Sequence, residues 1–173
     1  MAEVIDEPTT NAAADAPVPA LTQTERYTFV VKVADRPGTL EIIGATFAHR
    51  GVSLSATVGC DGSLDPDGRA TITLHFCSTP RRKEVLRATL ARLNRVLSVR
   101  EVPPELVQAV ALVRVAPDAG LPLTEAAVFP LPSPGREPVY RLIGTPEAVE
   151  SAIRAWRTAG KLRSVSYGVL AAD

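Results

Sequence analysis

The sequence predicts an α+β protein built from a complete βαββαβ unit and a second, shortened unit that lacks its first helix. Three observations predict this fold class. The apolar spacing alternates between the two-residue period of strands and the longer period of helices. This alternation completes one βαββαβ cycle before Pro103-Pro104. Beyond these prolines, strand and helix patterns return around a proline-rich stretch.

Length and composition set the limits of this prediction. A chain of 173 residues holds one ordinary domain or two small ones. Its 46% hydrophobic and 22% charged residues are typical of a globular protein. A formal net charge of +0 gives no reason to expect nucleic-acid binding. We expect neither a membrane span nor a signal peptide, because there is no long apolar run and no basic N-terminal region.

The chemistry-bearing residues indicate a non-catalytic protein. Cys60 and Cys77 fit a reduced, cytoplasmic protein, and a disulfide between them is the less favoured alternative. The two cysteines and two histidines have no metal-ligand spacing, so we expect no metal and no cofactor. We find no nucleophile with a base, no suitably placed carboxylate pair and no phosphate-binding loop, so we expect no enzyme activity.

We expect the chain to divide into three parts. Residues 1–25 are rich in Ala, Pro, Thr and acids without periodicity, which predicts a disordered or loosely ordered tail. The alternative is an arm that packs on a partner. Residues 26–103 then form the first domain and residues 104–173 the second.

The first domain opens with a strand over residues 27–33, in which alternate positions are apolar. A helix is predicted over residues 38–50, because one face carries Leu40, Ile43 and Phe47 at helical spacing. Between them lie Asp35, Pro37 and Gly38, where the strand passes into the helix N-terminus. The free N–H groups and the positive end of the helix dipole suit a carboxylate there.

The remainder of the first domain follows the same periods. Strands are predicted over residues 52–58, 69–77 and 96–102, with a hairpin loop rather than a calcium loop between the first two. On the strand 69–77, Ile72, Leu74 and Phe76 share one face, and His75 lies on the polar face, where we expect it to be exposed. The unit is therefore ferredoxin-like.

A second helix is predicted from Pro80 to about Asn94, with a hydroxyl of Ser78 or Thr79 as its cap. Its buried face is expected to hold Val85, Leu86, Thr89, Leu90 and Leu93. The other face is basic: Arg81, Arg82, Lys83, Arg87, Arg92 and the nearby Arg95. We interpret this face as solvated, with an acidic partner as the alternative.

The second domain begins with a strand over residues 106–115. The prolines of residues 117–138 exclude a full helix but allow a short helical turn over residues 124–129. A strand over residues 139–143 precedes a helix that begins with Thr145 as cap and Pro146 in its first turn. This helix ends at Gly160 and is followed by a strand over residues 164–170. Trp156 has core spacing on the helix, so we expect it to be buried.

These motifs resemble a known family. The pattern Asp35-Arg36-Pro37-Gly38-Thr39-Leu40, followed by residues 47–53, is similar to the first half of an ACT domain. ACT domains are small modules that bind amino acids and regulate metabolic enzymes. Residues 27–171 as a whole resemble the small regulatory subunits of acetolactate synthase. The matching pieces are the Gly38 turn, Arg50-Gly51, Asp65-Pro66 with residues 69–72, residues 110–115, Gly144-Thr145 and residues 167–169.

The resemblance implies a ligand site. The amides around Pro37-Gly38-Thr39 would take the carboxylate of an amino acid, Asp35 would face its ammonium group, and Ser53 would add a hydrogen bond. Leu40 belongs to the same motif. The family usually has Asn at the position of Ser53, and a long helix where this chain has residues 117–138. The alternative is that Asp35 to Gly38 forms a tight turn with a helix cap and binds nothing.

The resemblance also implies partners. We expect a homodimer through the first domain, with residues 30–47 at or near the contact and a valine-like, branched-chain amino acid at the interface. The expected protein partner is a thiamine-diphosphate-dependent catalytic subunit, which the ligand would regulate. The alternative is a stand-alone ACT-domain sensor or scaffold in another amino-acid or secondary-metabolite pathway.

Overall fold

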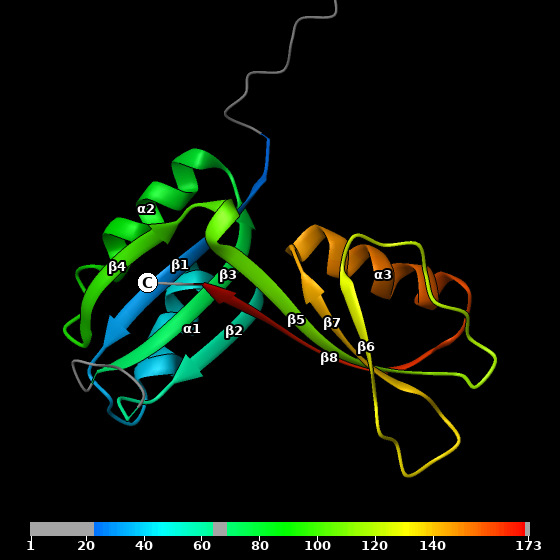
Figure 1. Ribbon diagram of the computed structural model, residues 1–173. Helices are drawn as coiled ribbons and strands as arrows, with labels where there is room; N and C mark the ends of the chain where they lie inside the picture. The colour runs from blue at the N-terminus through cyan, green and yellow to red at the C-terminus, as the bar shows by residue number, and fades with distance from the viewer. Residues whose placement is uncertain (1–22, 64–68, 172–173) are drawn as a thin grey trace, which may run out of the picture.

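The computed structural model describes residues 23–63 and 69–171 (Figure 1). Residues 1–22 of the predicted tail lie outside the described residues. Glu25, the last residue of that predicted tail, already belongs to the first strand.

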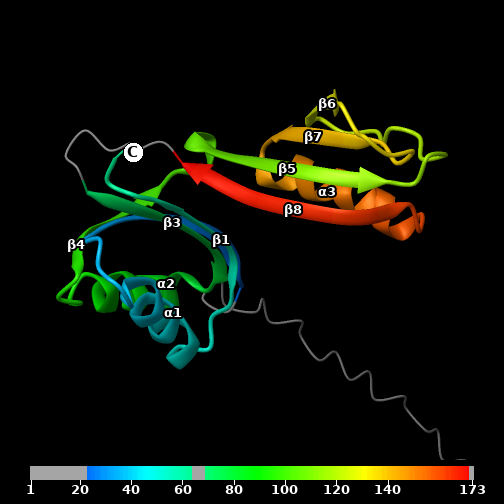
Figure 2. The ribbon, with the colours of Figure 1, turned by 90° about the horizontal axis from the view of Figure 1, so that it is seen from below.

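The first four-stranded sheet is antiparallel and has two helices on one face. Its elements are β1 (Glu25–Val33), α1 (Thr39–His49), β2 (Leu54–Cys60), β3 (Ala70–Ser78), α2 (Pro80–Leu90) and β4 (Val96–Val102). The strand order is β2-β3-β1-β4, the order of the predicted ferredoxin-like unit. Figure 2 shows both helices on one side of this sheet, with the second sheet toward its other side.

The core of the first unit lies between this sheet and its helices. Phe76 lies edge-on to both Phe29 and Phe47, with ring centroids 5.0 Å apart in each pair. Two predicted core positions are wrong. Leu40 is 54% exposed, because Thr39 turns inward in the first turn of α1. Val85 is 39% exposed, because the buried face of α2 is centred on Leu86 and Leu90.

The second sheet repeats the first without its first helix. It consists of β5 (Val107–Val115), β6 (Ala127–Leu131), β7 (Val139–Gly144) and β8 (Leu162–Ala171), with α3 (Pro146–Thr158) on one face. The 3-10 helix η2 (Pro104–Leu106) directly precedes β5. Its order, β6-β7-β5-β8, corresponds strand for strand to that of the first sheet. The predicted shortened unit is confirmed.

One short element differs from the prediction. Residues 124–129 form no helical turn; instead Ala127 to Leu131 pair with β7 as an edge strand. The prolines explain the difference, because they disfavour a helix but are tolerated at a sheet edge. Pro130 lies in β6, which pairs on one side only.

Helix α3 forms the core of the second unit, as predicted. The Thr145 hydroxyl accepts a hydrogen bond from the Ala148 N–H at 3.3 Å, which caps the helix. Trp156 is 3% exposed, and its Nε1 donates to the Gly120 carbonyl at 2.9 Å. Its ring stacks on Tyr140 with centroids 5.8 Å apart. No helix among the described residues is long and apolar enough to cross a membrane.

The second unit packs on the helix-free face of the first sheet. Val30 and Val102 belong to the same apolar cluster as Val107 and Ala109, and β8 contacts β2 and β3. This contact buries His75, which is 3% exposed. The prediction that His75 is exposed is therefore wrong, because the polar face of its strand is covered by the neighbouring unit.

Candidate functional site

The turn between β1 and α1 is built around Gly38. This residue is the N-cap of α1 and has φ = 81°, a left-handed conformation that glycine adopts without strain. Among the described residues, no side chain accepts a capping hydrogen bond at this end of the helix.

Thr39 stabilises the turn from within. Its side chain is 6% exposed, and its hydroxyl donates to the Arg36 carbonyl at 2.8 Å. The Thr39 N–H donates to the same carbonyl at 3.2 Å. The Thr39 hydroxyl therefore donates its hydrogen bond within the turn and stabilises the backbone conformation there.

The first turn of α1 leaves N–H groups available for a ligand. Within the described residues, the N–H groups of Gly38, Leu40 and Glu41 have no hydrogen-bond partner. Helix N-termini characteristically carry such unpaired donors together with a partial positive charge. The turn therefore has the donors that a carboxylate requires.

Arg95 supplies a cation to this turn, and the sequence did not reveal it. Its Nη1 donates to the Pro37 carbonyl at 2.5 Å, while its own carbonyl accepts from the Ala34 N–H at 2.8 Å. Nη1 would lie 3.3 Å from a Cβ at Gly38. The guanidinium therefore lies beside the backbone of Pro37 and Gly38.

The signal that could have identified Arg95 is topological. Strands β1 and β4 are antiparallel neighbours, and Val33 at the end of β1 pairs with Val96 at the start of β4. The residue that precedes β4 must then lie beside the turn that follows β1. Spacing along the chain does not show this, because Arg95 is 58 residues from Pro37.

Two carboxylates border the same turn. The Glu41 Oε2 would lie 3.8 Å from a Cβ at Gly38, and Asp35 is exposed on the strand side of the turn. A cation, unpaired amides and carboxylates thus surround Gly38. This arrangement matches the opposite charges of an amino-acid zwitterion, whose carboxylate and ammonium need complementary partners.

One chain brings together five of the six predicted ligand-binding residues. Asp35, Pro37, Gly38, Thr39 and Leu40 all belong to the β1–α1 turn or the start of α1.

Ser53 lies at the other end of α1. It lines a separate hollow of about 460 Å³ together with Gly51, Val52 and residues of the helix end. A helix of 11 residues separates the two places by about 16 Å. The Ser53 hydroxyl of the same chain therefore does not reach the turn.

No metal site accompanies the turn. Across residues 23–63 and 69–171, no group of three or more His, Cys, Asp or Glu side chains could hold a metal ion.

Comparisons with known proteins identify the fold. Neither the protein-family models nor the curated proteins give a match. Among solved structures, the acetolactate synthase small subunit from Thermotoga maritima superposes with a TM-score of 0.66. The identity is 17%, and the match covers 86% of this chain and 96% of that chain. This chain has the fold of that small subunit. The predicted resemblance to ACT-domain proteins is confirmed at the level of the fold.

A second solved structure gives a weaker likeness. The regulatory subunit of aspartate kinase from Thermus thermophilus matches with a TM-score of 0.41 and 18% identity, over 81% of this chain and 98% of that chain.

Proposed function

We propose that this chain is a cytoplasmic, non-catalytic regulatory protein that binds an amino acid and thereby modulates a catalytic partner. The observation that carries the proposal is the turn at Gly38, where unpaired amides lie beside the Arg95 guanidinium and two carboxylates. The fold of an acetolactate synthase small subunit supports it.

In the proposed binding mode, the ligand carboxylate accepts hydrogen bonds from the N–H groups of Gly38 and Leu40. The Arg95 guanidinium adds a charge-assisted contact, which is stronger than a neutral hydrogen bond. Asp35 faces the ammonium group. The Leu40 side chain, 54% exposed, offers apolar surface to a valine-like, branched side chain.

Ser53 enters this site only from a second copy of the chain. Because α1 separates Ser53 from the turn of its own chain, a homodimer through the first unit would bring the two together. Strands β2 and β4 are the edges of the first sheet, and open edges favour pairing. A ligand held between two copies would favour one dimer arrangement over another, and that shift is the regulatory signal.

The proposed catalytic partner is a large thiamine-diphosphate-dependent enzyme. The support is the likeness to a protein described as the small subunit of acetolactate synthase, which extends over nearly all of that subunit. Two departures favour an alternative: Ser53 replaces the usual Asn, and residues 117–138 contain β6 instead of a helix. A stand-alone sensor or scaffold in another amino-acid or secondary-metabolite pathway is the second candidate.

A pull-down from native cytoplasm distinguishes these two candidates. The tagged full chain should retain a large thiamine-diphosphate enzyme, whose activity should become sensitive to a branched-chain amino acid only when the chain is present. Retention of other proteins, with no effect on any thiamine-diphosphate enzyme, would favour the sensor or scaffold. The Gly38→Asp variant is the matched control, because it should keep the partner and lose the amino-acid response.

A further inference from the structure

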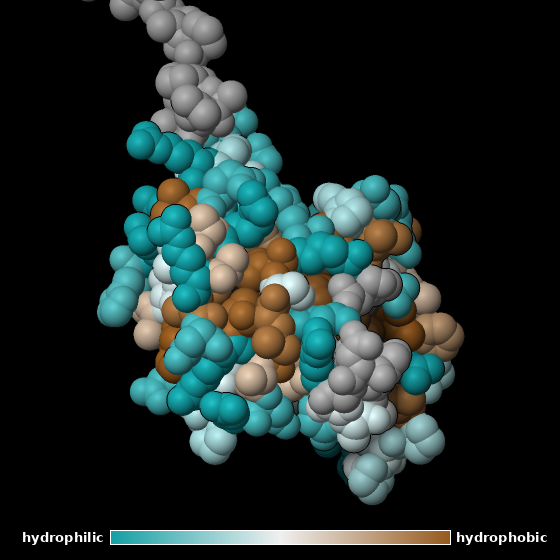
Figure 3. All heavy atoms as spheres, turned by 90° about the vertical axis from the view of Figure 1, so that its left-hand side faces the viewer, coloured by the Kyte–Doolittle hydropathy of each residue, from teal (hydrophilic) through white to brown (hydrophobic). Residues whose placement is uncertain are grey.

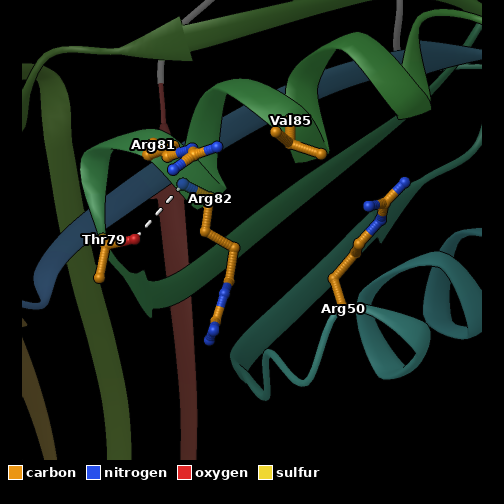
Figure 4. A pocket seen from close by; sticks show the side chains of 5 residues that line it. All are labelled: Arg50, Thr79, Arg81, Arg82 and Val85. Carbon is orange, nitrogen blue, oxygen red and sulfur yellow. Dashed lines mark hydrogen bonds between the residues drawn. The ribbon is translucent and has the colours of Figure 1, made fainter. Parts of the chain in front are cut away.

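A hollow lined by three arginines lies where the end of α1 meets the start of α2. It has a volume of about 300 Å³ and is lined by Arg50, Thr79, Arg81, Arg82 and Val85; we call it the basic hollow. Figure 4 shows Arg50 extending from the end of α1 toward α2, opposite Arg82. The Thr79 hydroxyl accepts the Arg82 N–H at 3.3 Å and so caps α2 at this point.

The three arginines carry charge that the rest of the described structure does not neutralise. All three are exposed, and none has a carboxylate within ion-pair distance among the described residues. The Arg50 Nη2 donates a long hydrogen bond of 3.5 Å to the Thr89 hydroxyl.

Other cations of α2 already use the nearby acids. Lys83 pairs with Glu84 at 3.0 Å and with Glu101 at 2.7 Å, and Arg87 pairs with Glu84 at 2.9 Å. The unmatched positive charge of α2 and of the end of α1 is therefore concentrated in the basic hollow.

The chain contains a segment of opposite charge. Residues 1–22, which lie outside the described residues, include Glu3, Asp6, Glu7 and Asp15 and no Lys or Arg. We call residues 1–22 the acidic segment. Because the formal net charge of the whole chain is +0, this segment offsets part of the basic excess elsewhere.

The acidic segment joins the described structure at the end of the first sheet that holds the basic hollow. The acidic segment enters the described structure just before β1, and Glu25 pairs with Ser78 in β3. Ser78 is followed directly by Thr79, which lines the basic hollow. Helix α1 runs back along the sheet, so that Arg50 also lies at this end.

The connection is long enough for contact. Asp15 lies ten positions before Glu25, and an extended chain spans up to about 3.3 Å per residue, or roughly 33 Å. The acids of the segment can therefore reach Arg50, Arg81 and Arg82.

We propose that the acidic segment binds in the basic hollow of its own chain. Exposed ion pairs are individually weak in water. Binding within one chain, however, proceeds at a high effective concentration, so weak ion pairs suffice to populate the contact. The contact neutralises the basic face of α1 and α2 and shields it from other anions. This proposal does not depend on the amino-acid site at Gly38.

The first test uses a Glu-specific protease on the native full chain. A combined Arg50→Gln, Arg81→Gln and Arg82→Gln variant should be cut after Glu3 about fivefold faster at low salt, the scale of a few exposed ion pairs. At about 1 M salt, which screens charges beyond roughly 3 Å, the difference should disappear.

The control for this test removes the same charge elsewhere. A combined Arg136→Gln, Arg154→Gln and Arg157→Gln variant changes three exposed arginines of the second unit. It should be cut at the wild-type rate. Equal cleavage rates in all three proteins, or equal acceleration in both variants, would overturn the proposal.

A second test locates the segment. A nitroxide is attached at Asn11→Cys in a chain with Cys60→Ser and Cys77→Ser, and backbone amide signals are followed by NMR. The proposal predicts salt-sensitive broadening at Arg50, Arg81 and Arg82. Mixing spin-labelled chains with isotope-labelled chains that lack the nitroxide detects binding between copies. Broadening only in that mixture, broadening elsewhere, or none at all would contradict binding within one chain.

Discussion

At the residue scale, Gly38 is the position on which the candidate ligand site depends. Its φ of 81° disfavours other residues, and a Cβ there would lie 3.3 Å from the Arg95 Nη1. We expect Gly38→Asp to abolish amino-acid binding, because its carboxylate would pair with Arg95 and occupy the place of the ligand carboxylate. Calorimetric titration measures the loss.

The control for this substitution is Gly38→Asn. Asparagine has nearly the same shape, tolerates the left-handed conformation better than most residues and carries no charge. It should retain more binding than Gly38→Asp. Equal binding by wild type and Gly38→Asp would show that the ligand carboxylate does not bind at this turn.

Asp35 makes the second residue-scale prediction. If its carboxylate faces the ligand ammonium, Asp35→Ala should weaken binding by about 1.5–3 kcal/mol, the scale of a hydrogen bond to a charged group. Asp35→Asn keeps the shape of the side chain without its charge, so its affinity for the ligand should lie between those of the wild type and Asp35→Ala. An unchanged dissociation constant for Asp35→Ala in the same titration would remove Asp35 from the site.

The residue scale also shows how far a sequence can predict this site. The turn was identifiable because a strand period, a Pro-Gly pair and a helix period follow one another within residues 27–50. Arg95 was not identifiable, because its contact with Pro37 depends on the pairing of β1 with β4. Likewise, Ser53 was placed in the site by resemblance, and only the structure shows that α1 separates it from the turn.

At the element scale, the sequence correctly predicted the strands and helices that are specified by local signals such as capping residues and apolar spacing. The Thr145-Pro146 start specifies α3, and Trp156 lies on its buried face as its spacing indicates. Two predictions were wrong because they depend on tertiary contacts. Residues 127–131 became an edge strand because β7 offered a pairing partner, and His75 became buried because the second unit covers β3.

The burial of His75 between the first sheet and the second unit predicts that the free energy of unfolding depends on pH. His75 Nδ1 lies 2.8 Å from the Thr28 hydroxyl. The charged groups around it are Arg26 on β1 and Glu147 and Glu150 on α3, which Arg26 contacts at 3.5 and 2.8 Å. Burial lowers the pKa of His75 from its usual 6.5, and Arg26 lowers it further, while the two glutamates oppose the shift.

The sign of the effect follows from this shift. Between the lowered folded-state pKa and 6.5, the unfolded chain binds more protons than the folded chain, so acid favours unfolding. The free energy of unfolding should therefore be fully maintained above pH 6.5 and should fall as the pH drops through the folded-state pKa. Urea denaturation at a series of pH values measures this.

The matched variant for the pH series is His75→Gln, which cannot titrate in this range but keeps hydrogen-bonding groups. Its unfolding free energy should vary less with pH between about 6.5 and 5 than that of the wild type. Parallel curves for the two proteins would exclude His75 as the source of the dependence.

At the scale of the whole molecule, Figure 3 displays an apolar area bordered by hydrophilic residues on the side that lies at the left of Figure 1. Leu97 on the edge strand β4 is 51% exposed.

We propose residues 26–103 and 104–173 as two domains, of which the first provides a homodimer contact near residues 30–47. Light scattering should give twice the chain mass at micromolar concentration. A monomer mass would contradict this.

Calorimetric titration with valine, leucine and isoleucine measures whether the turn at Gly38 binds an amino acid. The wild type is compared with Gly38→Asp and with Ser53→Asn, which introduces the residue usual in the acetolactate synthase small subunits that this chain resembles. We expect saturable heat from at least one of the three amino acids with the wild type, equal or tighter binding by Ser53→Asn, and no binding by Gly38→Asp. The absence of binding heat from all three amino acids, in both the wild type and Ser53→Asn, would show that the turn at Gly38 does not bind a branched-chain amino acid.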